Sequence, residues 1–168
     1  MEMENKDQNQ QSSEAVGSFL WEIVRMLVIA LVIIVPLRLF IAEPFIVDGQ
    51  SMEPNFHNND YLIVDKISYR VADVSRGDVV VFHYPKDTSQ YFIKRIIGLP
   101  GEQVKIASGR VTIINSAHPD GMLLDESFLP NQAVTFTPGG EKTTQLGENQ
   151  YFVMGDNRAH SSDSREWG

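Results

Sequence analysis

A serine in a turn and a lysine in an apolar strand are the residues of this sequence best placed to do chemistry. Ser51 lies in the segment GQSMEPN, between Gly49 and Pro54, which favour turns. A serine hydroxyl is a poor nucleophile until a neighbouring base takes its proton. Most serines in such turns only form local hydrogen bonds, and the segment is not the G-x-S-x-G of a nucleophile elbow. The segment alone makes Ser51 a candidate and no more.

Lys94 lies in YFIKRIIG, whose β-branched and aromatic residues are typical of a strand. Alternate residues of a strand share a face, so Lys94 lies on the same face as Phe92 and Ile96. If that face is buried, desolvation lowers the pKa of the lysine amine, and a neutral amine can act as a general base. On a solvent-exposed face, the more common place for a strand lysine, the amine would stay charged.

A third candidate segment is MGDNRAHSSDSREWG, from Met154 to Gly168, which follows the apolar run QYFVM. Its aspartates and arginines are dense enough to form a buried ion pair that braces a site. They would serve equally well in a solvated loop. Composition alone does not separate these two interpretations.

The elements that must position these residues are mostly strands. From Ile46 onward, short alternating or apolar runs are separated by Asp, Gly and Pro, a pattern that predicts a mainly β fold with antiparallel sheets. The stretch 107–149 is richer in Gly, Pro, Ser and Thr, and we expect a small loop-rich β insertion there. We therefore expect a catalytic domain over residues 42–168.

The N-terminal part differs sharply from this β-rich body. Residues 1–18 are polar, with almost no apolar side chains, and predict a disordered tail. Residues 19–41 are apolar and would be about 34 Å long as a helix, enough for the roughly 30 Å hydrocarbon core of a bilayer. Trp21 suits an interfacial anchor. We expect a retained transmembrane helix; a buried core helix is the alternative.

Composition excludes several classes of function. The 168 residues carry a formal net charge of −8, which argues against nucleic-acid binding. The chain has no cysteine, so a thiolate metal site and a cysteine nucleophile are excluded. The four histidines lack zinc-binding spacings, and we expect neither a metal site nor another cofactor.

Taken together and in this order, the segments resemble type I signal peptidase, a membrane-bound serine protease family that removes secretory signal peptides. The matching segments are SMEP (51–54), RGDVVVFHYP (76–85), YFIKRIIGLPGE (91–102) and GDNRAHSSDSREWG (155–168). One short motif would be weak evidence, but four in the family order behind an apolar helix are specific. The family has a mostly antiparallel β fold and usually continues for another strand beyond the last motif.

The resemblance implies a role for each matching residue. Ser51 corresponds to the nucleophile and Lys94 to the general base. Ser161 corresponds to a serine whose hydroxyl helps to orient the lysine amine. Asp163 and Arg165 correspond to acidic and basic residues that brace the site from behind.

The resemblance also implies an oxyanion hole and substrate pockets. The oxyanion hole uses the backbone N–H of the nucleophile, and Gly49 stands where some members have an additional serine. Phe45, Val47 and Ile93 would line shallow pockets for the small P1 and P3 side chains of the substrate. Asn55 stands where threonine is usual.

Partners and location follow from the same resemblance. The substrates would be preproteins with signal peptides, and the expected partners are these preproteins and the lipid bilayer, close to the secretion translocon. We expect a single-pass protein of the cell membrane with its catalytic domain on the non-cytoplasmic side. Lys6 and Arg25 precede the charge-free run 26–37 and Arg38 follows it, too few basic residues to determine the orientation from charge.

Two other functions fit parts of the sequence. A self-cleaving LexA-type Ser/Lys protease would carry an N-terminal DNA-binding domain, where this chain has an acidic tail and an apolar segment. A membrane-tethered β-domain that binds exported polypeptides without cutting them would not need both Ser51 and Lys94.

Overall fold

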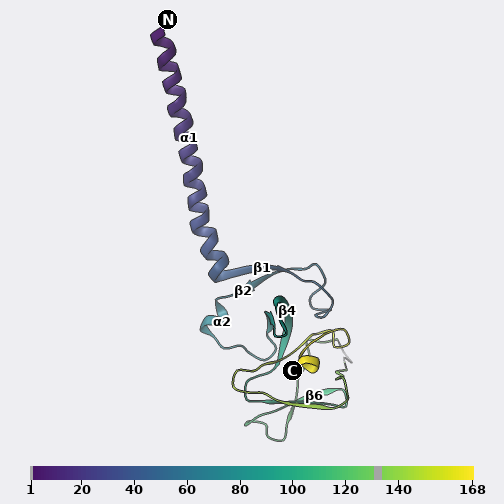
Figure 1. The fold of residues 1–168 in the computed structure, drawn as a ribbon. Coiled ribbons are helices and arrows are strands. Elements are labelled where there is room, and N and C mark those ends of the chain that lie inside the picture. The colour runs from purple at the N-terminus through teal and green to yellow at the C-terminus, as the bar shows by residue number, and fades with distance from the viewer. Residues whose placement is uncertain (1, 131–133) are drawn as a thin grey trace. The chain divides into compact units, whose positions relative to one another are not determined.

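The computed structural model describes residues 2–130 and 134–168. The chain divides into two compact units, residues 1–43 with 65–68 and residues 44–64 with 69–168. The first is drawn in purple to blue and the second mainly in teal to yellow (Figure 1). Each unit is described here by itself.

The first unit is built on a long helix, α1 (Glu2–Pro36), followed by a π-helical turn, η1 (Leu37–Ile41). Pro36 has no N–H to donate, which accounts for the end of regular α-helix at this residue. Ion pairing between Lys66 and Glu43 (2.7 Å) and a hydrogen bond from Lys66 N to Ile41 O join residues 65–68 to the end of this segment.

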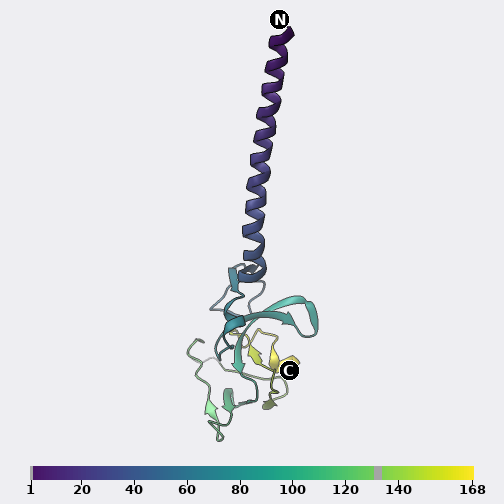
Figure 2. The same cartoon turned by 90° about the vertical axis from the view of Figure 1, so that its left-hand side faces the viewer.

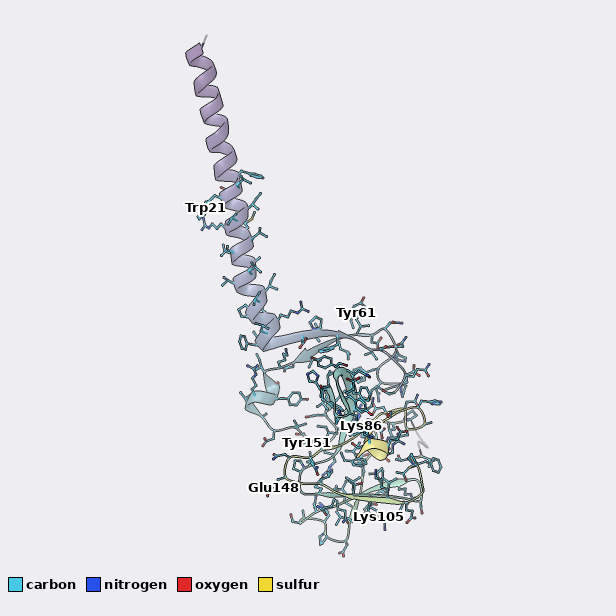
Figure 3. The ribbon with its side chains drawn as sticks, in the orientation of Figure 1. Trp21, Tyr61, Lys86, Lys105, Glu148 and Tyr151 are labelled. Atoms are coloured by element: carbon cyan, nitrogen blue, oxygen red, sulfur yellow. The ribbon has the colours of Figure 1, made fainter. Side chains whose placement is uncertain are left out.

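Residues 19–41 form a helical segment long and apolar enough to cross a membrane, as the sequence predicted. The large apolar side chains along this segment are exposed, and Figure 3 shows Trp21 projecting outward from α1. The side chains are therefore available to lipid rather than packed in a protein core. A core helix would be mostly buried, so this exposure fits a membrane span or an N-terminal signal sequence.

The polar N-terminal residues differ from the expected disordered tail, because α1 extends back to Glu2. The prediction weighed only the lack of apolar side chains to bury. Glu, Gln, Lys and Met are good helix formers, and a helix already formed by the apolar segment can propagate into them without a new nucleation step.

The second unit is mainly β, in agreement with the sequence. After β1 (Ala42–Ile46) and β2 (Tyr61–Asp65), which form a two-stranded sheet, come the short helix α2 (Ser68–Val71) and a long antiparallel hairpin of β3 (Val79–Tyr84) and β4 (Asp87–Gly98). The hairpin is the long teal ribbon of Figure 2. β9 (Phe152–Met154) pairs with the other edge of β4, which makes β4 the central strand of a three-stranded sheet.

A four-stranded sheet has the order β7-β6-β5-β8. Its strands are β5 (Gln103–Ala107), β6 (Arg110–Ile114), β7 (Met122–Leu123) and β8 (Lys142–Gln145), and the chain closes with the helical turn α3 (Ser164–Trp167). Side chains alternate as expected in β5, where Val104 and Ile106 are buried and Lys105 points to solvent (Figure 3).

One hydrophobic core joins these two sheets. It consists of Ile97, Val104, Ile106, Val111, Ile113, Leu124, Leu146, Phe152 and Met154. The strands β5 to β8, which overlap the expected insertion over 107–149, thus pack on the same core as the strand that carries Lys94. They support that strand instead of forming a core of their own.

Candidate active site

Ser51 lies in a tight turn between β1 and β2. Met52, next to it, is buried and its carbonyl accepts hydrogen bonds from the N–H groups of Asn55 and Phe56. Gly49 has a φ of 100°, a conformation that glycine adopts without strain, and its N–H donates to the Asn58 side chain. The turn is therefore fixed on both sides of the serine.

Lys94 lies on β4 with its side chain on the buried face. The residue is only 4% exposed, and its Nζ lies 2.7 Å from Ser51 Oγ. An N–H of the amine donates to the carbonyl of Ile93 (2.9 Å), and the amine lies 5.1 Å from the centre of the Phe92 ring. The structure therefore brings together the two residues that the sequence singled out separately.

Burial changes the acid–base chemistry of this amine. Desolvation lowers the pKa of Lys94 to about 8, although the negative charge of Asp163 acts in the opposite direction. A substantial fraction of the amine is thus neutral near pH 8. A neutral Nζ can accept the proton of Ser51 Oγ, which is the step a serine nucleophile requires.

Asp163 and Arg165 form a buried, two-pronged ion pair. Arg165 donates from Nε to one carboxylate oxygen and from Nη2 to the other, each at 2.8 Å, and the Gly155 N–H donates to the same carboxylate. Burial alone would raise the pKa of the Asp163 carboxyl, but these donors hold it below its usual value. Arg165 also donates to the carbonyl oxygens of Phe136 and Arg158, so it ties together three segments behind the dyad.

Ser161 lies beside the Ser51 turn and the Asp163 carboxylate. Its hydroxyl is buried beside the Asp163 carboxylate and helps to lower the pKa of that carboxyl, although it forms no hydrogen bond of good geometry with another described residue. A Cβ added to Gly155 would collide with this hydroxyl and with the carbonyl of Ser51. Ser161 is therefore packed against the turn that carries Ser51, and its expected role in orienting the Lys94 amine stays a prediction.

A groove of about 420 Å³ opens over the dyad. Ser51 and Lys94 line it, as do Phe45, Val47 and Ile93, which the sequence suggested as pocket residues. The Ser51 backbone N–H has no acceptor within the described part of the chain, and is free to bind an oxyanion. β1 pairs with β2 alone among the described strands, which leaves its other edge open to an extended peptide.

Sequence reasoning missed a second buried ion pair beside the dyad. Arg95 follows Lys94 and points to the other face of β4, where it donates to both carboxylate oxygens of Asp156 at 2.8 and 2.6 Å. The available signal was the GDN triplet, in which Asp156 follows the glycine that packs on Ser51. Asp156 and Arg95 are 61 residues apart in sequence, and no local pattern relates them.

A family model described as "Signal peptidase, peptidase S26" matches residues 20–168. The chain belongs to the signal peptidase family. A probable signal peptidase I-2 of Synechocystis is 38% identical over 153 residues, covering 88% of this chain and 65% of that protein. A signal peptidase I of Bacillus licheniformis is 33% identical and the match covers 96% of this chain and 83% of the relative.

A solved signal peptidase I of Enterococcus faecalis is similar at 30% identity with a TM-score of 0.47, over 58% of this chain and 89% of that one. The family predicted from the four motifs is thus confirmed by the family model and the relatives. The chain spans 65% of the length of the Synechocystis relative.

Proposed function

We propose that this protein is a membrane-anchored serine endopeptidase that removes signal peptides from preproteins, with Ser51 as nucleophile and Lys94 as general base. The observation that carries the proposal is the 2.7 Å separation of Ser51 Oγ from the buried Lys94 amine, whose pKa is lowered to about 8. A structural serine and a solvated lysine would not need this arrangement.

The mechanism follows from the geometry. With the amine neutral, the Ser51 hydroxyl donates its hydrogen bond to Nζ, and Lys94 takes the proton as Oγ attacks the scissile carbonyl. The oxyanion binds the free N–H of Ser51, and the protonated amine then gives its proton to the departing amine of the mature protein. Departure of that amine leaves the signal peptide joined to Ser51 Oγ as an ester. Lys94, neutral again, takes a proton from the water that attacks the ester carbonyl, and it returns this proton to Oγ as the signal peptide leaves.

The bracing residues keep this geometry fixed. Asp163 and Arg165 act as positioning residues, since they hold the loop after β9 against the nucleophile turn and contact no substrate. Ser161 packs between that loop and the turn. We propose that its hydroxyl, which lies beside Asp163, helps to orient the Lys94 amine.

Substrate selection is assigned to the groove. An extended signal peptide would pair with the open edge of β1, and its alternate side chains would point into the groove. Phe45, Val47 and Ile93 form an apolar wall suited to the small P1 and P3 residues of signal peptides. The helical segment 19–41 would hold the enzyme in the cell membrane as a single-pass protein with its catalytic domain on the non-cytoplasmic side, close to the translocon and to the emerging preprotein.

The test is cleavage of a preprotein whose signal ends in Ala-x-Ala by the full-length protein in detergent. We expect wild type to release the mature protein, and Ser51→Ala and Lys94→Met to release none while keeping a folded melting transition. Cleavage that survives Ser51→Ala would assign the activity to another residue. Binding of the preprotein by wild type with no cleavage would favour the non-catalytic β-domain.

A further inference from the structure

The side-chain amide of Asn55 makes two long-range hydrogen bonds although the residue itself is exposed. Nδ2 lies 2.8 Å from Asp156 Oδ2 and 2.9 Å from the carbonyl oxygen of Phe128. Both partners are acceptors, so the nitrogen of the amide, and not its oxygen, must face them. Both amide protons are therefore used to fix one end of the nucleophile turn.

Asp156 connects this amide to the strand that carries the base. The residue is 3% exposed, and its carboxylate accepts two hydrogen bonds from Arg95 as well as the one from Asn55. Arg95 is the immediate neighbour of Lys94 on β4. One buried carboxylate thus joins the turn of Ser51 to the strand of Lys94.

The residue after Asp156 holds the other end of the same turn. The Asn157 N–H donates to the carbonyl of Ser51 (3.0 Å), and its side-chain amide donates to the carbonyl of Gln50 (3.1 Å). Asn157 thus fixes the turn at Gln50 and Ser51, and Asp156 fixes it four residues after the serine, at Asn55.

We propose that Asn55 is a positioning residue for the nucleophile: its amide locks the Ser51 turn to the Asp156–Arg95 ion pair and so sets the distance between Ser51 and Lys94. This inference rests on the function proposed above. A misplacement of about 1 Å between reacting groups can lower the rate about 100-fold. We therefore expect slower catalysis in an enzyme whose Ser51 turn is anchored at one end only.

Asn55→Asp is the sharpest test because the substitution is isosteric. It replaces the donating nitrogen with an oxygen that faces the Asp156 carboxylate, and like charges in contact repel. We expect kcat to fall about 100-fold, and about 10-fold in Asn55→Ala, which loses the bonds without adding repulsion. KM should stay within about twofold in Asn55→Ala, since Asn55 does not line the groove. Asn149→Asp, the same change at an exposed turn residue, is the matched control and should keep wild-type kinetics.

The pH profile separates positioning from other roles. Asn55 does not contact Lys94, so Asn55→Ala should lower the plateau of the rate profile and leave its midpoint near pH 8. Wild-type kcat in Asn55→Asp would overturn the proposal. So would a loss of activity that matches a loss of folded protein at the assay temperature.

An independent measurement distinguishes failure of this inference from failure of the proposed function. If wild type shows no Ser51-dependent cleavage, the function fails, but the bridge can still be observed directly by NMR of the full chain in detergent. We expect the two side-chain amide protons of Asn55 to exchange with water at least 10-fold more slowly than those of Asn149. Equal exchange rates would show that the bridge does not exist in solution.

Discussion

At the scale of single residues, the proposed mechanism depends on the ionisation of the Lys94 amine. Because desolvation lowers the pKa of Lys94 to about 8, the competent neutral form is the minor species at pH 6 and the major one at pH 9. We expect kcat/KM to rise about tenfold per pH unit below pH 8 and to level off above it. The measurement is peptide cleavage across pH 5.5–10, with the melting temperature followed over the same range. A flat profile would contradict the assignment of Lys94 as base.

The same pKa shift makes the stability of the folded protein depend on pH. The unfolded chain binds a proton at Lys94 up to about pH 10.5, and the folded chain only up to about pH 8. The buried amine therefore lowers the free energy of unfolding by its full amount below pH 8. This loss disappears as the pH rises from 8 to 10.5. Lys94→Met, which removes the charge and keeps much of the volume, should abolish activity and raise the free energy of unfolding at pH 7 by on the order of 3 kcal/mol.

Denaturant unfolding of wild type and Lys94→Met at pH 7 and pH 10 tests this expectation, and the gain should shrink at the higher pH. Lys105→Met, at an exposed position on β5, is the control and should change stability little at either pH. If Lys94→Met is less stable than wild type, the Lys94 amine must be charged and well paired in the folded protein.

At the scale of elements, the loop after β9 decides whether the dyad can form. Gly155 is buried where this loop passes the nucleophile turn, and an added Cβ would collide with the Ser51 carbonyl and the Ser161 side chain. Backbone cannot move aside as a flexible side chain can. We therefore expect Gly155→Ala to lower kcat/KM at least about 100-fold and to cost about 1–3 kcal/mol of stability.

Gly147→Ala is a suitable comparison for Gly155→Ala. The added Cβ there would meet only the side chain of Gln150, which can shift. The measurements are kcat/KM for peptide cleavage and the melting temperature of the two variants, and both should fall more in Gly155→Ala. Equal, small effects would indicate that the loop has room near Ser51.

Sequence reasoning succeeded at this scale where a short-range pattern carried the information. Strand alternation placed Lys94 on the face opposite Arg95, and the motifs placed Ser51 in a turn. It did not find the bridge from Asn55 to Asp156, because those residues are 101 positions apart and their pairing depends on how β4 and β9 are placed in one sheet. It also missed the helix before residue 19, because it considered burial and left out helix propensity.

At the scale of the whole molecule, the segment 19–41 is proposed to hold the catalytic unit at the membrane. The segment is strongly apolar and its side chains are unburied, whereas Ser51 and Lys94 lie in the β-rich unit. Membrane attachment and peptide hydrolysis should therefore be separable by mutation. Leu31 and Ile34 are three residues apart on one face of α1, and arginine at a bilayer centre costs about 2.5–3.5 kcal/mol for each residue.

We expect the double variant Leu31→Arg with Ile34→Arg to be largely extracted from membranes by alkaline carbonate, and to cleave a membrane-inserted preprotein poorly. In detergent its cleavage of a short soluble peptide should equal that of wild type, because Ser51 and Lys94 are untouched. The exchange Leu31→Ile with Ile34→Leu, which preserves hydropathy, should behave as wild type in both assays. Full retention of the double arginine variant in carbonate-washed membranes would show that another part of the chain anchors it. Equal loss of both cleavage activities would show that α1 is also needed to position Ser51 and Lys94.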